Sequence, residues 1–124
     1  MKGEISMKES ILRTKAKEFA LHVIAICDTI STKNNRGALT NQIVRSSTSV
    51  GANIHEAAYA ASPADFINKL HIALKECYET EYWLELFVKS DILSKETVVN
   101  LYTQCGTIRR ILIASINTAK ENVK

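Results

Sequence analysis

His55, Glu56 and Tyr59 form the pattern in this sequence that comes closest to a catalytic motif. In the zinc hydrolase pattern His-Glu-x-x-His, two imidazoles one helical turn apart bind the metal and the glutamate acts as general base. Here a phenol replaces the second imidazole, and it must lose a proton with a pKa of about 10 before it binds zinc well. The other histidines, His22 and His71, stand in different predicted helices. The sequence therefore predicts no metal site.

Other catalytic groupings are also missing from the sequence. The hydroxyl-rich run RSSTS at 45–49 has no histidine at a spacing that identifies a base, and hydroxyls within a helix usually bond to a carbonyl one turn earlier. No Gly-x-x-x-x-Gly-Lys phosphate loop occurs. Lys75 and solvent account for the carboxylates at Glu76, Glu79, Glu81 and Glu85 without catalysis. We expect a protein without enzymatic activity, catalytic residues or cofactors.

The composition indicates a single domain, 1–124, in a reducing compartment. A chain of 124 residues and 13.8 kDa buries enough surface to fold without disulfides or metals. Three cysteines, an odd number without Cys-x-x-Cys spacing, suggest core packing in the cytoplasm. No apolar stretch approaches the roughly 20 residues of a membrane span, and 1–7 carry no apolar targeting region. A net charge of +3 permits nucleic-acid binding without requiring it.

Turn and capping residues divide the chain into four predicted helices, at 8–31, 40–61, 63–89 and 95–120. The run KNNRG supplies turn chemistry after the first. Ser62 and Pro63 cap and open the third helix, and Ser94 caps the fourth. Each segment carries one apolar stripe that alternates steps of four and three, which is typical of helices packing at shallow angles. Because the connections are short, we predict an all-α, up-down-up-down antiparallel four-helix bundle.

Two of the predicted helices carry more apolar surface than one core contact requires. Helix 63–89 has apolar residues outside its main stripe, and helix 95–120 likewise adds Val99, Tyr102, Ile111, Ile113 and Ile116. Spare aromatic and aliphatic faces usually indicate a partner, although a wider core would also explain them. We predict a homo-oligomer whose interface includes Tyr78, Tyr82, Trp83 and Leu86.

The predicted register places one basic and one acidic residue at the same height. If the turn at 61–63 joins two antiparallel helices, residues whose numbers sum to about 124 are level, which sets Arg45 beside Glu79. An ion pair between them would fix the register of the two helices. The alternative is two independently solvated charges.

A basic zone is expected where the first helix begins and the fourth helix ends. The same register reasoning brings Arg13 and Lys17 toward Arg109 and Arg110, while helix 63–89 carries the acidic cluster. A binder of phosphate backbones would show such a separation of charge, and an ordinary salt-bridged surface would show it too.

The stretch 39–93 carries a family signature. The matching positions in helix 40–61 are Gln42, Arg45, Ser46, Ser49, Val50, Asn53, Ile54 and Glu56. Those in helix 63–89 are Phe66, Leu70, Ile72, Ala73, Glu79, Leu84 and the run KECYETEYWL. The stretch resembles the four-helix bundle proteins of the 23S ribosomal RNA intervening-sequence protein family. Many members read Asn-Ile-Ala-Glu-Gly where this chain reads Asn53-Ile54-His55-Glu56-Ala57, so His55 departs from the pattern.

The resemblance implies a small bacterial protein, since some family members are encoded within intervening sequences of 23S ribosomal RNA genes. The family is similar to the accessory protein of diversity-generating retroelements, a basic pentamer that binds nucleic acid and a reverse transcriptase. By that resemblance this chain would form a homopentamer, and five chains at +3 each would carry +15. Arg45, Asn53, Glu56 and Glu79 would be structural family positions that hold neighbouring helices in place.

Two functions of different classes follow from these expectations. In the first, the protein is a non-enzymatic oligomer that binds RNA or DNA through Arg13, Lys17, Arg109 and Arg110. In the second, it is an assembly module that recruits a protein partner through the apolar faces of helices 63–89 and 95–120.

Overall fold

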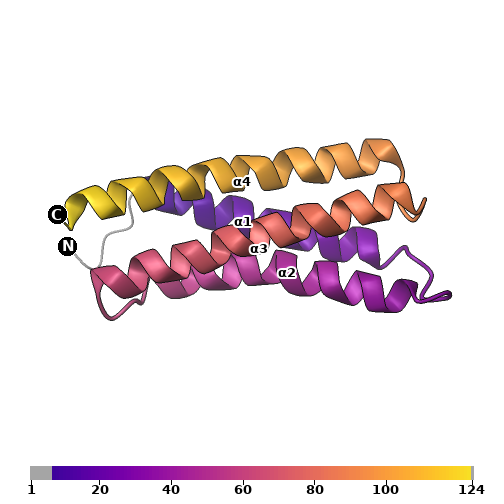
Figure 1. Ribbon diagram of the computed structural model, residues 1–124, viewed down its shortest axis with the longest axis horizontal. Helices are drawn as coiled ribbons and strands as arrows, with labels where there is room; N and C mark the ends of the chain where they lie inside the picture. Colours follow the sequence, from indigo (N-terminus) through magenta and orange to yellow (C-terminus); the bar gives the residue numbers. More distant parts are fainter. Residues whose placement is uncertain (1–6, 124) are drawn as a thin grey trace.

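The computed structural model describes residues 7–123 of the chain, with side chains from residue 9 onward. It contains four helices, α1 (Met7–Cys27), α2 (Arg36–Ala57), α3 (Pro63–Lys89) and α4 (Lys95–Asn122) (Figure 1), and the described residues include no strand. The expectation of an all-α protein with four helices is confirmed. None of these helices is long and apolar enough to cross a membrane.

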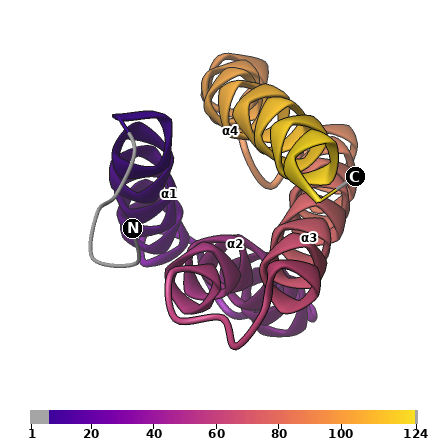
Figure 2. The ribbon, with the colours of Figure 1, turned by 90° about the vertical axis from the view of Figure 1, so that its left-hand side faces the viewer.

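The four helices lie alongside one another around a shared core. Each helix packs against the next in the chain, and α4 also packs against α1, which completes the ring seen end-on in Figure 2. The α1–α2 and α3–α4 turns lie at one end of the bundle, and the α2–α3 turn lies at the other (Figure 1). The predicted stripes bury the largest core side chains at the centre: Leu12, Phe19, Ile43, Leu84, Phe87, Leu101, Ile108 and Leu112.

The starts of α3 and α4 agree with the sequence because each has a strong local cap. The Ser62 hydroxyl accepts the backbone N–H of Asp65 at 3.1 Å, and Pro63 occupies the first helical position. The Ser94 hydroxyl accepts the N–H of Thr97 at 3.2 Å in the same way. Helix α3 spans the predicted 63–89, and α4 runs two residues past the predicted end at 120.

The turn between α1 and α2 differs from the prediction at both edges. Helix α1 ends at Cys27 rather than at 31, because the N–H and hydroxyl of Thr29 both bond to the Ile26 carbonyl, at 3.0 and 2.6 Å. Helix α2 begins at Arg36 rather than at 40, directly after Asn34 and Asn35, whose φ values of 58° and 67° are left-handed. The asparagines therefore make the turn, and α2 gains one more turn of helix.

Helix α2 also ends four residues before the predicted position, at Ala57. The N–H groups of Ala58 and Tyr59 bond to carbonyls three residues back, so the helix tightens and stops. The N–H of Ala61 then bonds to the Asp65 carboxylate at 3.1 Å, and Ser62 is extended as a residue before proline should be. Ala61, the last residue of the predicted helix 40–61, is consequently exposed.

Small hydroxyl side chains occupy the contact between α2 and α3. The Thr80 hydroxyl lies 2.8 Å from Ser46 Oγ and 2.8 Å from the carbonyl oxygen of Glu76, and both hydroxyl side chains are fully buried. A hydroxyl both donates and accepts, so this chain of contacts satisfies the buried polar atoms. The contact joins the two helices with hydrogen bonds at a place where their backbones lie close together.

Gly51 provides the equivalent close approach between α2 and α1. A Cβ atom at this position would lie 3.6 Å from the Ala16 Cβ and 3.8 Å from its carbonyl carbon. That separation is ordinary van der Waals contact, so a methyl group fits and a longer side chain does not. The distance between α1 and α2 is therefore set by two of the smallest side chains.

We expect Gly51→Ala to stabilise the protein by about 0.5–1 kcal/mol, because it removes backbone freedom from a mid-helix position without a clash. Gly51→Leu should destabilise it by about 1–3 kcal/mol through overpacking against Ala16. Urea unfolding measures both changes. Ala52→Leu, at the exposed neighbouring position, is the control and should change stability little. Equal effects of the two leucine variants would contradict the close approach.

Candidate functional site

Arg45 on α2 bridges to two carboxylates of α3. Its guanidinium contacts the Glu79 carboxylate and lies 3.4 Å from Glu76 Oε1. The contact that the register predicted between Arg45 and Glu79 is therefore present. The Arg45 side chain remains 47% exposed, so solvent screens the pair and its energetic contribution is small.

Glu79 connects this ion pair to the aromatic side chain of Trp83. The indole N–H of Trp83 donates to Glu79 Oε2 at 2.9 Å, and the Trp83 side chain packs against the core. The carboxylate thus accepts from a guanidinium on one side and an indole on the other. Trp83, which the sequence placed in an oligomer interface, is half-buried on the α2 side of α3, and Leu86 is also half-buried.

The remaining two family positions act in different ways. Glu56 Oε1 accepts from Lys69 Nζ at 2.9 Å, which joins the end of α2 to the start of α3. The Glu56 carboxylate raises the pKa of Lys69 through this hydrogen bond. Asn53 instead donates to the Ser49 carbonyl of its own helix at 2.9 Å. Glu56 therefore holds two helices together, whereas Asn53 satisfies its own backbone.

Arg13 and Lys17 line a groove between α1 and α2 with a volume of about 780 Å³. Its floor consists of small residues, including Ala16 and Gly51. The Arg13 guanidinium lies 3.4 Å from Nδ1 of His55 across the groove. This surface carries two cations and an imidazole, together with the carboxylate of Glu18.

Arg109 lies in a different environment, between α4 and α3. Its Nε donates to Glu81 Oε2 at 2.9 Å, and its guanidinium carbon stands 5.7 Å from the Tyr78 ring centroid. The hydrogen bond to Glu81 raises the pKa of Arg109. Glu81 is only 7% exposed, so removal of Arg109 would leave a buried carboxylate uncompensated. Arg109 is therefore engaged in the fold through its Nε.

The four basic candidates consequently fall into two pairs with different neighbours. Arg13 and Lys17 face α2, whereas Arg109 faces α3 and Arg110 contacts Thr107 within α4 at 3.3 Å. The sequence did not anticipate the Arg109–Glu81 pair, although the positions lie on facing edges of consecutive helices. The register rule applied to the α3–α4 turn pairs residues whose numbers sum to about 184, whereas Arg109 and Glu81 sum to 190, so the long arginine side chain reaches a carboxylate that the rule does not place level with it.

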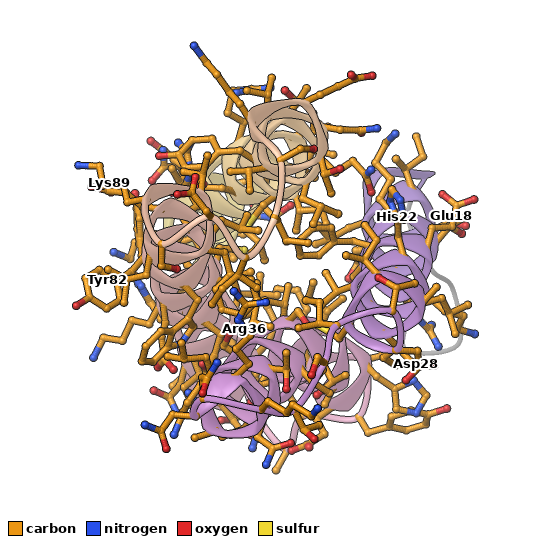
Figure 3. All side chains as sticks on the ribbon, turned by 90° about the vertical axis from the view of Figure 1, so that its right-hand side faces the viewer. Glu18, His22, Asp28, Arg36, Tyr82 and Lys89 are labelled. Atoms are coloured by element: carbon orange, nitrogen blue, oxygen red, sulfur yellow. The ribbon has the colours of Figure 1, made fainter. Side chains whose placement is uncertain are left out.

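Another polar contact that the sequence reasoning missed joins α1 to α4. Gln104 Nε2 lies 2.8 Å from His22 Nδ1 and 2.9 Å from Asn100 Oδ1. His22 is on the side of α1 that faces α4, and Figure 3 shows it beside Glu18. His22, like His55, thus takes part in a contact between helices.

His55 is exposed and stacks at a tilt on Tyr59, with ring centroids 5.4 Å apart. The two rings, one helical turn apart in the sequence, are in contact although α2 ends before Tyr59. Tyr59 lies in the turn after α2 and is itself 75% exposed. Within residues 7–123, no group of three or more His, Cys, Asp or Glu side chains is placed to hold a metal ion.

The cysteines occupy packed environments. Cys77 and Cys105 are fully buried where α3 meets α4, as core packing required. The hydrogen bond to Cys77, together with burial, raises the pKa of the Cys105 thiol. Burial raises the pKa of Cys27 to about 11, so this thiol stays protonated at neutral pH. Cys27 and Cys105 therefore lack the depressed pKa of an activated nucleophile.

An exposed apolar face covers the outer side of α3 and α4. Figure 3 shows Tyr82 pointing away from the bundle. Tyr78 and Tyr82 are 51% and 54% exposed. The neighbouring helix adds further exposed apolar side chains, at Val99, Tyr102 and Ile113. We call these five residues the tyrosine face.

The Arg45–Glu79 contact is testable by a double-mutant cycle with alanine substitutions. We expect a coupling free energy of about 0.2–1 kcal/mol, as for exposed ion pairs. Glu79→Ala alone should destabilise more than Arg45→Ala, because it also removes the acceptor of the Trp83 indole N–H. A cycle between Arg45 and Glu85, which contacts Lys89 instead, is the control and should show no coupling. Equal couplings in the two cycles would refute a specific contact.

Comparison with known proteins identifies the family. The family model described as 23S rRNA-intervening sequence protein matches residues 8–114. A crystal structure of a protein with unknown function from the S23 ribosomal protein family of Bacteroides thetaiotaomicron has 40% sequence identity and a TM-score of 0.85, covering 90% of this chain and 99% of the other. A search of curated proteins finds no significant match. The chain belongs to the 23S rRNA-intervening sequence protein family.

Proposed function

We propose that this protein is a non-enzymatic, cytoplasmic homo-oligomer of up-down-up-down bundles that binds RNA or DNA. The observation that carries the proposal is the tyrosine face, which leaves three tyrosines and two aliphatic side chains exposed on a single chain. Exposed aromatic clusters of this kind are typical of surfaces that bind a partner. The family resemblance favours a second copy as that partner and a pentamer as the assembly.

Self-association through the tyrosine face has a defined energetic basis. Tyrosine supplies a large contact area at low entropic cost and is enriched among the residues that dominate interface energies. The Arg109–Glu81 pair lies beneath Tyr78, so the face rests on a rigid, hydrogen-bonded base. Trp83 packs edge-to-face on Tyr82, with ring centroids 5.2 Å apart, and Trp83 and Leu86 are half-buried beside the face.

The nucleic-acid surface of the proposal is the groove lined by Arg13 and Lys17. Both side chains come from α1 and stand one turn apart beside a floor of small residues, so a phosphate backbone could approach closely. Assembly repeats this groove in every copy, which multiplies the positive field. Arg109 supports the fold instead, and Arg110 remains a peripheral candidate.

A protein-binding module is the second candidate, and the engagement of Arg109 favours it. The hydrogen bond to Glu81 occupies one N–H of Arg109, one of the four predicted phosphate-binding cations, while the net charge of +3 already counts both partners. The tyrosine face would then bind a different protein rather than a second copy. A monomer in solution that fails to bind nucleic acid would support this candidate.

Light scattering of the purified protein tests self-association. We expect the wild-type protein to be an oligomer. Tyr78→Ser plus Tyr82→Ser should raise the concentration at which the oligomer dissociates at least about tenfold, as for central aromatic interface residues. Tyr59→Ser removes an even more exposed tyrosine outside the face and should leave the mass unchanged. A monomeric wild-type protein would overturn the oligomer.

RNA binding across a salt series tests the groove. In a plot of log K against log salt concentration, we expect Arg13→Gln plus Lys17→Gln to make the slope shallower by about 1.5–2. This change corresponds to two lost phosphate contacts. Lys33→Gln plus Lys95→Gln removes the same charge at the other end of the bundle and is the control. Arg109→Gln should lower stability more than it lowers RNA affinity. Wild-type protein that does not bind near physiological salt would refute the nucleic-acid function.

A further inference from the structure

A cavity of about 680 Å³ lies where the α2–α3 turn closes one end of the bundle. Its walls include the apolar side chains of Leu12, Ile54, Phe66 and Leu70, contributed by three different helices. The turn at 58–63 forms part of its lining. The volume is in the range of roughly 300–1,000 Å³ that small-molecule sites occupy, and the mixture of apolar walls with few polar groups is typical of them.

Ser115 adds an unexplained polar group to this lining. It comes from α4, is 7% exposed, and its hydroxyl has no hydrogen-bond partner within the described part of the chain. Serine within a helix normally bonds to the carbonyl one turn earlier, and leaving a buried hydroxyl unpaired costs free energy. Because the hydroxyl rotates about one side-chain bond, it can bond instead to a molecule in the cavity.

Arg13 brings a positive charge to the same cavity. Its one hydrogen-bond contact among residues 9–123 is with His55 Nδ1 at 3.4 Å, and a guanidinium has five N–H donors. Glu9 also lines the cavity, and its carboxylate would repel an anion. The group best placed to bind a ligand charge is therefore a guanidinium, whose planar geometry matches a carboxylate.

We infer that the cavity binds a small carboxylic acid with an apolar body. Arg13 binds the carboxylate, Phe66, Tyr59 and Pro63 contact the apolar body, and Ser115 bonds to a polar atom of the ligand. Glu9 opposes the ligand charge and limits the affinity. This site would bind a small carboxylic acid, whereas the nucleic-acid groove would bind phosphates. Arg13 borders both.

The probe for the first test is 3-(4-hydroxyphenyl)propionate, titrated into the full chain in the absence of nucleic acid and followed by two-dimensional amide NMR. We expect saturable shifts at Ala57, Phe66 and Ser115. The corresponding neutral amide should bind about tenfold more weakly or worse, because it loses the charge-assisted hydrogen bonds. Shifts spread over the surface, or none at millimolar probe, would overturn the inference.

Substitutions identify the groups involved. Arg13→Gln should weaken the acid about tenfold, and Glu9→Gln should tighten it several-fold by removing a like charge. Lys15→Gln removes a charge from α1 outside the cavity and should leave the affinity within about twofold. If Arg13→Gln tightened binding and Glu9→Gln weakened it, the cavity would favour an amine, and the inference would be refuted.

Ser115→Ala separates a ligand contact from a structural role. It should weaken the hydroxylated probe several-fold and leave 3-phenylpropionate unaffected. The free protein should keep or gain thermal stability, because the lost hydroxyl has no partner. Equal loss for both probes, or a lower melting temperature, would contradict the assigned role. RNA binding is measured separately, so its outcome does not depend on this one.

Discussion

The close packing of α2 between α1 and α3 is the constraint on which the rest of the structure depends. On one side Gly51 meets Ala16, and on the other Ser46 meets Thr80 through a buried 2.8 Å hydrogen bond. Small side chains allow these approaches, and the hydroxyls satisfy each other where no apolar side chain would fit. Larger residues here would move both neighbours outward and open the core. The α1–α2 groove and the α2–α3 ion pairs both exist because these two distances are short.

Each side of helix α3 has a different set of contacts. Toward α2 it presents Glu79, which accepts from Arg45 and from the Trp83 indole. Toward α4 it presents Glu81, which is held by Arg109. Its outer side carries tyrosines that contact neither neighbour's core. Two sides of α3 therefore contact neighbouring helices, and its outer aromatic side is the one open to a further partner.

Local chemistry explains which parts of the fold could be predicted. The starts of α3 and α4 followed from Ser62 and Ser94, because a capping serine acts on its own backbone within three residues. The end of α2 could not be predicted in the same way, because it depends on the Asp65 carboxylate reaching back to the Ala61 N–H from the next helix. The alanines after Ala57 continue the helical pattern of the sequence although the chain turns there, so the pattern does not reveal where α2 ends.

The sequence by itself determined the four helices, the side of each that faces the core and the register that brings Arg45 to Glu79, since these follow from periodicity and short turns. Only the tertiary structure decided which charges remain free. Arg13 and Arg109 look equivalent in the sequence, yet one lines a groove and the other is held by a buried carboxylate. The reason is geometric, because a small rotation about a helix axis decides which neighbour a long side chain meets, and periodicity does not define that rotation finely enough.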